Sequence, residues 1–514
     1  MSYRTLRLMI GDGGQAFTME EHPMVRMALV GKPRRLERAE TFFDTPDLRL
    51  RQSGWTLTLR RRGERWFGCV ASTRVERAGG GEWECGQGDA MPDWGEMRRH
   101  LPEGVREEIR GRKPEALFEM ACVEERVRLE FPDGTRIQAR ELRGELRRDG
   151  VVVEPFHELI LDALSGAPQR FFHAALALAR HYAARLEPLS PADRGFVRLD
   201  AGWLAPVPRR GTEVGRGAGV LEAFSLAGSG LLQEILDNLA PLAHGSGATR
   251  LGAAVQARGA VARLAGLFGL FHPLLPDKVR REPESELNWL LGELEPLGEW
   301  LALERQVLQP LRRRCGEYVQ LEQVSEKYAR KRQLAAERVA GVVTSVRFTQ
   351  LMLGFAGWLV GVEELRNSLL ATEPLLRERL QGSGEGLARE GLRRLHKLMG
   401  EQGGRYWEAE GPFREPVEPL AWAEAIAYAL ELFPAWFEEK KARPYREALA
   451  GVVGSLRALV GLADARRLWD DLDPGRDEAL RALFAGWHGA LLEREWEEGK
   501  RAWGLFSAAA APFG

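Results

Sequence analysis

The sequence predicts an α+β protein in which an antiparallel β domain is followed by an all-α part of two helical bundles. Three observations predict this fold class. Short runs of alternating apolar and polar residues fill the first two hundred positions, a segment rich in Pro and Gly follows, and nearly everything beyond it places apolar residues at helical spacing. With 514 residues and 44% hydrophobic content, the chain can form several packed domains.

The β domain is predicted from its strands and from the turns between them. The first strand, residues 5–10, reads TLRLMI and alternates as a strand with one buried face does. Further strands are predicted at 56–62, 125–131 and 158–164. PDGT at 132–135 and RRDG at 147–150 are typical of hairpin turns. An Ala- and Leu-rich helix is predicted over 167–186.

The all-α part begins after a segment without periodicity. Residues 205–220 are rich in Pro and Gly and are predicted to be a linker. At least eight helices are predicted beyond it, at 221–244, 253–271, 283–311, 324–362, 376–400, 420–441, 448–472 and 477–510. The predicted domains are a β domain at 1–204, a first helical half at 221–345 and a second helical half at 346–514.

Charge and cysteine content exclude several classes of protein. The 73 Lys and Arg residues balance 74 Asp and Glu residues, so we expect neither nucleic acid nor a membrane surface as a partner. The four cysteines show no CxxC spacing, which argues against a thiolate zinc site. The start of the chain does not read as a signal peptide, and the apolar window 341–362 contains Arg347. We therefore expect a buried helix there and a cytoplasmic protein.

One segment of the β domain is specific enough to suggest a family. Residues 40–62, ETFFDTPDLRLRQSGWTLTLRRR, strongly resemble the second and third strands of CYTH domains. This triphosphate tunnel family includes inorganic and thiamine triphosphatases and one class of adenylate cyclase. GEWE at 81–84, EPFHELILDALSG at 154–166 and LEPLSPADRG at 186–195 resemble later segments of the family. The resemblance covers residues 1–204 and implies an antiparallel β-tunnel.

The helical part resembles a CHAD domain, a helical module that often follows CYTH in bacterial inorganic triphosphatases. The stretches that carry this resemblance are 268–276, RFTQLMLGFAGWL at 347–359 and the tail WGLFSAAAAPFG at 503–514. The order and lengths of the two parts also fit that arrangement.

The resemblance implies a tunnel chemistry of which this sequence lacks several parts. In the family, carboxylates hold Mg²⁺ or Mn²⁺, basic residues grip the phosphates, and the first strand carries an inward-facing Glu-x-Glu-x-Lys. Here the matching strand reads TLRLM at 5–9, so both carboxylates and the lysine are missing. Arg7 places a positive charge where a metal ligand belongs. We therefore expect no metal site and no cofactor.

A few charged residues remain at tunnel positions. The candidates for a residual site are Arg60, Glu82, Glu84, Glu158 and Asp162. Two interpretations are open: these residues form a residual catalytic site, or they belong to a partly polar lumen in which the acids pair with arginines. The sequence favours the second, because Ile160 and Leu164 stand where the family alternates charged residues.

The CHAD-like part shows a similar loss. CHAD helices carry His-x-x-Arg followed by a basic ladder, which suits an acidic polymer such as polyphosphate. Here Val255 replaces the histidine. The candidate anion-binding residues are Arg258, Arg263, Arg312, Arg313 and Arg314. For Arg312, Arg313 and Arg314 the sequence favours the alternative that they lie on solvated helix faces among neighbouring glutamates.

These losses predict a catalytically degenerate CYTH–CHAD protein that acts as a non-enzymatic binding or scaffold protein. We expect a protein partner, bound through the helical CHAD-like domain. One alternative is an inorganic triphosphatase that hydrolyses tripolyphosphate with Mg²⁺ or Mn²⁺ at a rearranged site. Another is a protein that binds tripolyphosphate or polyphosphate weakly without catalysis.

Overall fold

The computed structural model divides the chain into two compact units. The sheet unit holds Ser2–Leu204 and Thr344–Leu353, and the helical unit holds Ala205–Val343 and Gly354–Gly514. The structure describes residues 5–11, 19–62, 65–73, 80–84, 94–315, 319–409, 411, 416–472 and 478–513.

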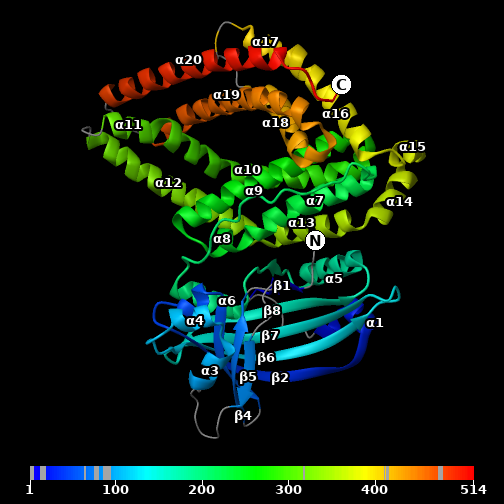
Figure 1. Ribbon diagram of the computed structural model, residues 1–514, viewed down its shortest axis with the longest axis vertical. Coiled ribbons are helices and arrows are strands. Elements are labelled where there is room, and N and C mark those ends of the chain that lie inside the picture. Colours follow the sequence, from blue (N-terminus) through cyan, green and yellow to red (C-terminus); the bar gives the residue numbers. More distant parts are fainter. Residues whose placement is uncertain are drawn as a thin grey trace. The chain divides into compact units, whose positions relative to one another are not determined.

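A nine-stranded antiparallel sheet forms the sheet unit (Figure 1). Its strands are β1 (Thr5–Met9), β2 (Leu29–Asp44), β3 (Trp55–Arg62), β4 (Arg65–Ser72), β5 (Gly80–Glu84), β6 (Glu115–Glu130), β7 (Arg136–Arg148), β8 (Val151–Ser165) and β9 (Arg185–Leu186). They lie in the order β5-β4-β3-β2-β6-β7-β8-β1-β9. The helices of this unit are η1 (Met19–Glu21), α1 (Pro23–Ala28), α2 (Arg49–Gln52), α3 (Trp94–His100), α4 (Glu103–Glu108), α5 (Pro168–His181) and α6 (Pro191–Leu199).

Both predicted hairpin turns are present. Residues 132–135 join β6 to β7, and residues 147–150 contain the reversal between β7 and β8. Asp149 and Gly150 have φ angles of 50° and 77°, the pair of left-handed residues that a tight two-residue hairpin needs. The predicted helix over 167–186 is shorter than expected. Ala183 has a φ angle of 46°, and the chain then enters β9, which pairs with β1.

The alternation within β2 sends neighbouring residues to different apolar clusters. Phe42 of β2 belongs to a cluster with Phe118, Met120, Phe156 and, from α6, Phe196. The next residue of β2, Phe43, belongs instead to a cluster built from β3, β4, α3 and α4. One face of the central strands is therefore covered by α6, which matters for the site described below.

The helical unit consists of long helices with shorter ones between them. Its α-helices are α7 (Val220–Asp237), α8 (Leu239–His244), α9 (Gly247–Phe271), α10 (Asp277–Leu303), α11 (Gln309–Arg314), α12 (Val319–Val343), α13 (Val346–Val360), α14 (Val362–Thr372), α15 (Arg377–Leu380), α16 (Gly384–Leu398), α17 (Gly404–Trp407), α18 (Val417–Leu432), α19 (Glu439–Asp471) and α20 (Glu478–Ala508). Shorter helical turns are η2 (His272–Leu274), η3 (Glu304–Leu308), η4 (Pro374–Leu376), η5 (Met399–Gly403) and η6 (Pro434–Trp436).

The predicted long helix over 324–362 is two helices in the structure. The chain bends by 54° between α12 and α13, and the Ser345 hydroxyl accepts the Phe348 N–H at 3.1 Å, as a cap at a new helix start does. The first residues of α13 belong to the sheet unit. There the buried Thr349 hydroxyl accepts the Leu186 N–H of β9 at 2.7 Å. This hydrogen bond satisfies a backbone donor at the sheet edge.

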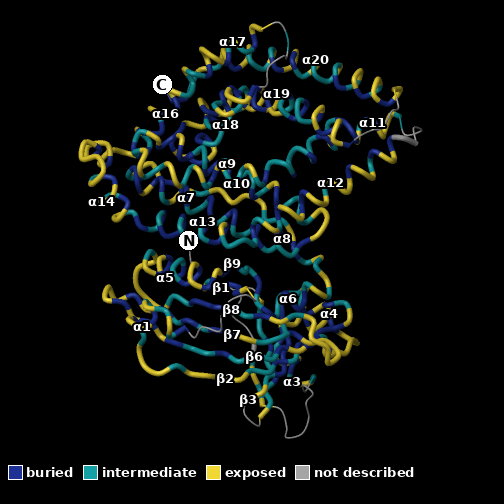
Figure 2. The backbone as a smooth tube through the Cα atoms, turned by 180° about the vertical axis from the view of Figure 1, so that it is seen from behind, coloured by how far each residue is buried: buried dark blue, intermediate teal, exposed yellow. Residues whose placement is uncertain are grey.

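Burial varies along the helical unit. Figure 2 shows exposed residues around α14, whereas α9 contributes a run of buried residues to the core. Among the described residues, α19 is long and apolar enough to cross a membrane, and the bent pair α12–α13 passes the same test as one broken span. Half of the most apolar window of α19 is buried inside the protein, as in a core helix of a helical domain.

Candidate functional site

The sheet unit contains a cavity of about 1420 Å³ over the middle of the sheet. Residues of β2, β3, β6 and β7 line it, and six of them are arginines while three are glutamates. The charged lining residues are Arg35, Arg38, Arg60, Arg61, Arg126, Arg143, Glu37, Glu40 and Glu145. Outside the lining, Arg147 pairs with Glu145, while Glu124 and Glu141 pair with Arg38, Arg126 and Arg143. With these partners included, seven arginines face five glutamates, so an excess of positive charge remains.

Strand register brings these side chains together. Glu40 of β2 lies opposite Arg60 of β3 and opposite Met120 of β6, while Arg38 lies opposite Cys122. Cys122 in turn faces Gly144 of β7, where an added Cβ would collide with the Ala121 carbonyl oxygen. A glycine at position 144 therefore lets β6 and β7 approach at the cavity wall.

The carboxylates next to the cavity are engaged by arginines. Glu124 of β6 is fully buried and pairs with Arg38 at 2.8 Å and with Arg126. Glu40 lies 3.4 Å from the Arg60 guanidinium. A carboxylate held in this way has few lone pairs left for a metal ion, because each arginine occupies the directions that a cation would use.

Glu158 of β8 is held in a buried ion pair with α6. Its Oε1 lies 2.5 Å from Nη1 of Arg194, and both side chains are almost completely buried. Arg194 also pairs with Glu154, which Arg198 contacts at 2.7 Å. Burial raises the pKa of Glu158 even though Arg194 lowers it, and Glu187 adds to the rise.

The other predicted tunnel residues lie apart from Glu158. Asp162 of β8 accepts hydrogen bonds from the Thr5 hydroxyl at 2.7 Å and from Arg140 at 2.9 Å. Glu82 and Glu84 lie on β5, with five strands between β5 and β8 in the sheet order. Glu84 pairs with Arg65 at 3.6 Å near the surface.

The donor set of the sheet unit does not fit a divalent metal. Among the residues that the structure describes, no group of three or more His, Cys, Asp or Glu side chains could hold a metal ion. The two thiols near the cavity are not activated either. Burial raises the pKa of Cys69, and burial raises that of Cys122 to about 11, so both stay protonated near neutral pH.

The predicted anion-binding arginines of the helical unit mostly contact acids of the same chain. Arg258 forms a bidentate pair with Glu295, with contacts of 2.9 and 2.7 Å. Arg263 lies 2.5 Å from Glu234, with both side chains nearly buried. Arg312 lies 3.4 Å from Glu304. Arg313 is exposed, and Arg314 lies over the ring of Trp487.

Sequence reasoning does not single out Arg38, Glu124 or Arg194, although they define the polar part of this unit. Arg194 is 36 residues from Glu158 and lies on a helix, so no periodic pattern connects the two. The signal that could have found Glu124 is the run of charged residues within β6, an otherwise half-apolar strand.

Comparison with known proteins supports the fold of the helical part. Residues 230–470 match the CHAD domain family model. The structure of the CHAD domain from the plant Ricinus communis is 22% identical, covers 60% of this chain and 98% of its own, and aligns with a TM-score of 0.50. The prediction of a CHAD domain is therefore confirmed, and the antiparallel sheet agrees with the predicted CYTH-like unit before it.

Two further solved structures are similar at lower scores. PptA from Streptomyces chartreusis is 16% identical, covers 57% of this chain and 99% of its own, and gives a TM-score of 0.35. HpAC1 from Hippeastrum, described as a candidate adenylyl cyclase with a dominant triphosphatase activity, is 13% identical over 39% of this chain and 97% of its own, with a TM-score of 0.25. No curated protein matches the chain.

Proposed function

We propose that this chain is a non-enzymatic binding protein whose sheet unit binds a phosphate-rich anion, such as tripolyphosphate, without a divalent metal. The observation that carries the proposal is the cavity lining of six arginines and three glutamates. A guanidinium donates parallel hydrogen bonds to phosphate oxygens and stays charged at all relevant pH values. Glu124 and Glu141 pair with Arg38, Arg126 and Arg143, so the ligand competes with these acids for the arginines of the cavity.

The paired carboxylates support binding in preference to hydrolysis. A metal-dependent triphosphatase needs carboxylates that converge on a cation and orient a water molecule. In this chain Glu124, Glu158 and Asp162 instead form ion pairs with arginines. The triphosphatase alternative would require these ion pairs to open and the acids to regroup.

We also propose that the helical unit contributes through contact with a protein partner, as the sequence suggested. Its arginine ladder is largely neutralised by acids of the same chain, as the pairs Arg258–Glu295 and Arg263–Glu234 show. This neutralisation weakens the case for polyphosphate on that surface, because affinity for such a polymer depends on unpaired positive charge.

The first prediction concerns Arg38, which lines the cavity and is about one-third exposed. Arg38→Gln should weaken tripolyphosphate binding about tenfold, the value of one charge-assisted hydrogen bond. Isothermal titration calorimetry in metal-free buffer measures this. The matched control is Arg148→Gln, an exposed arginine at the end of β7 that does not line the cavity. Equal affinities for both variants would contradict the proposed site.

The second prediction concerns Glu124→Gln, which should strengthen tripolyphosphate binding where Arg38→Gln weakens it. The substitution keeps the shape of the buried side chain and removes the charge that holds Arg38 and Arg126. Both guanidiniums then become available to the ligand, so tripolyphosphate should bind several-fold more tightly. A loss of binding that appears only with Mg²⁺ present would instead assign Glu124 as a metal ligand and favour the triphosphatase alternative.

A further inference from the structure

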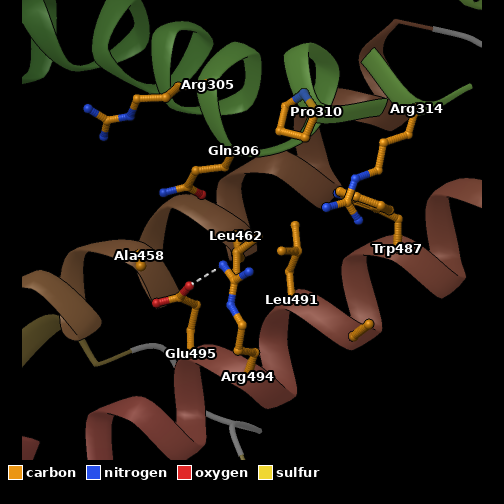
Figure 3. Close-up of a pocket in the computed structure, with 11 residues that line it drawn as sticks. Arg305, Gln306, Pro310, Arg314, Ala458, Leu462, Trp487, Leu491, Arg494 and Glu495 are labelled. Atoms are coloured by element: carbon orange, nitrogen blue, oxygen red, sulfur yellow. Dashed lines mark hydrogen bonds and ion pairs between the residues drawn. The ribbon is translucent and has the colours of Figure 1, made fainter. Parts of the chain in front are cut away.

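The helical unit contains a second pocket with a different chemical character. It has a volume of about 480 Å³ and lies between η3, α11, α19 and α20 (Figure 3). This volume falls within the range of small-molecule sites, roughly 300–1,000 Å³. Its main lining residues are Arg305, Gln306, Arg314, Trp487, Leu491 and Arg494.

The local sequence explains why a pocket forms here. Pro310 has no N–H and cannot donate to the Gln306 carbonyl, so the helix widens into the π-turn η3, where the Gln309 N–H donates to the Glu304 carbonyl five residues back. On the facing helix, a Cβ at Gly461 would lie 3.0 Å from the Gln306 amide. The glycine therefore leaves room for that amide at the pocket wall.

The pocket combines an apolar floor with a cationic rim. Leu462 and Leu491 provide apolar surface, and the Trp487 ring provides a flat aromatic face. The Arg314 guanidinium lies 5.2 Å from the centre of that ring, an arrangement visible in Figure 3. Arg305 and Arg494 complete the rim.

The charge of the lining is positive. The three lining arginines face a single lining carboxylate, Glu495, which lies 2.7 Å from Arg494. Glu498 lies farther from Arg494, at 3.9 Å. Because Glu495 neutralises Arg494, the remaining positive charge of the rim comes from Arg305 and Arg314.

Two polar atoms of the lining residues are buried without a hydrogen-bond partner. They are the indole N–H of Trp487 and the amide oxygen of Gln306. One is a donor and the other an acceptor, and buried polar groups are nearly always satisfied. A ligand with polar atoms beside a flat ring supplies partners to both.

We propose that this pocket binds an amphiphilic anion, a small molecule with a flat aromatic body and a phosphate or carboxylate head. The ring lies beside Trp487 and Leu491, and the head pairs with Arg314, whose guanidinium lies over the Trp487 ring. An inorganic phosphate leaves the apolar floor uncovered, and a neutral arene leaves the arginines without an anion. This site goes beyond the proposed oligophosphate cavity, which lies in the other unit.

The test is a calorimetric titration of the full chain with three probes. We expect 1-naphthyl phosphate to bind with a stoichiometry of one, and both 1-naphthol and inorganic phosphate to bind at least tenfold more weakly. The titration uses the Arg38→Gln background so that the sheet cavity contributes less to the measured heat. The absence of heat with 1-naphthyl phosphate at about 1 mM, the weak end of specific binding, would overturn the proposal.

Two variants place the binding in this pocket. Arg314→Glu should weaken 1-naphthyl phosphate at least tenfold, because it replaces a rim cation with a like charge. Arg481→Glu, an exposed arginine on α20 outside the pocket, is the matched control and should leave affinity within twofold. Circular dichroism checks that both variants are folded. Equal weakening by both, or inorganic phosphate binding as tightly as 1-naphthyl phosphate, would contradict the site.

Discussion

Arg194→Met is expected to destabilise the sheet unit by about 3–5 kcal/mol, because removing one partner of a buried ion pair leaves the other charge uncompensated. Glu158 has no exposed side-chain surface, and Arg194 is only 4% exposed. The variant also removes the partner of Glu154 inside the protein. Hydrogen exchange of the β8 amides measures the effect, since it reports on the sheet unit alone.

The stability penalty of Arg194→Met should depend on pH, because it depends on whether the Glu158 carboxyl group is ionised. Burial raises the pKa of Glu158 above its ordinary value of 4.5. A folded-state pKa above the unfolded value means that the associated stability is fully present below 4.5 and is lost as the pH rises through the folded-state pKa. Without Arg194 that pKa rises further, so the penalty of Arg194→Met should shrink as the pH falls from neutral.

A double variant separates charge from shape. Arg194→Met with Glu158→Gln removes the charge of Glu158, so a substantial part of the lost stability should return and its pH dependence should weaken, although Glu154 still loses Arg194. A penalty that is the same at every pH, or that the double variant does not reduce, would show that Arg194 acts through packing alone.

Arg263→Met is expected to destabilise the helical unit by about 2–4 kcal/mol for a similar reason. Arg263 lies 2.5 Å from Glu234, and their side chains are 11% and 9% exposed. The sequence analysis predicted that Arg263 binds an anion. This substitution distinguishes that role from a structural role in the ion pair with Glu234. A structural role predicts a lower midpoint of urea unfolding and unchanged polyphosphate binding. An anion-binding role predicts an unchanged midpoint and weaker polyphosphate binding.

The control for this prediction is again a double variant. Arg263→Met with Glu234→Gln should recover most of the lost stability, because no charge is then left buried between α7 and α9. If the double variant is as unstable as the single one, the ion pair is not the source of the effect.

Local features of this fold could be predicted from the sequence because they depend on neighbouring residues. The alternation in TLRLM at 5–9 correctly predicted β1, and the Asp149–Gly150 pair correctly predicted the turn between β7 and β8. The single helix predicted over 324–362 was wrong, since the apolar spacing continues through Ser345 while its hydroxyl caps a second helix. Spacing alone does not reveal a cap in the middle of an apolar run.

The cavity and its ion pairs could not be predicted in the same way. Glu158 and Asp162 were predicted as residual tunnel acids from the family resemblance, but their partners Arg194 and Arg140 come from a helix and from another strand. The arginines of the cavity come from four strands, and only the register of β2, β3, β6 and β7 brings them together. A single sequence fixes neither that register nor the long-range pairing.

The measurement that tests the central claim most directly is calorimetric titration of the purified chain with tripolyphosphate, with and without Mg²⁺ or Mn²⁺, followed by a phosphate-release assay on the same sample. The account predicts binding that does not need the metal, that weakens with salt, and that is not followed by phosphate release. Metal-dependent binding with turnover, lost in Glu158→Gln or Asp162→Asn, would contradict it and establish a triphosphatase with a rearranged site.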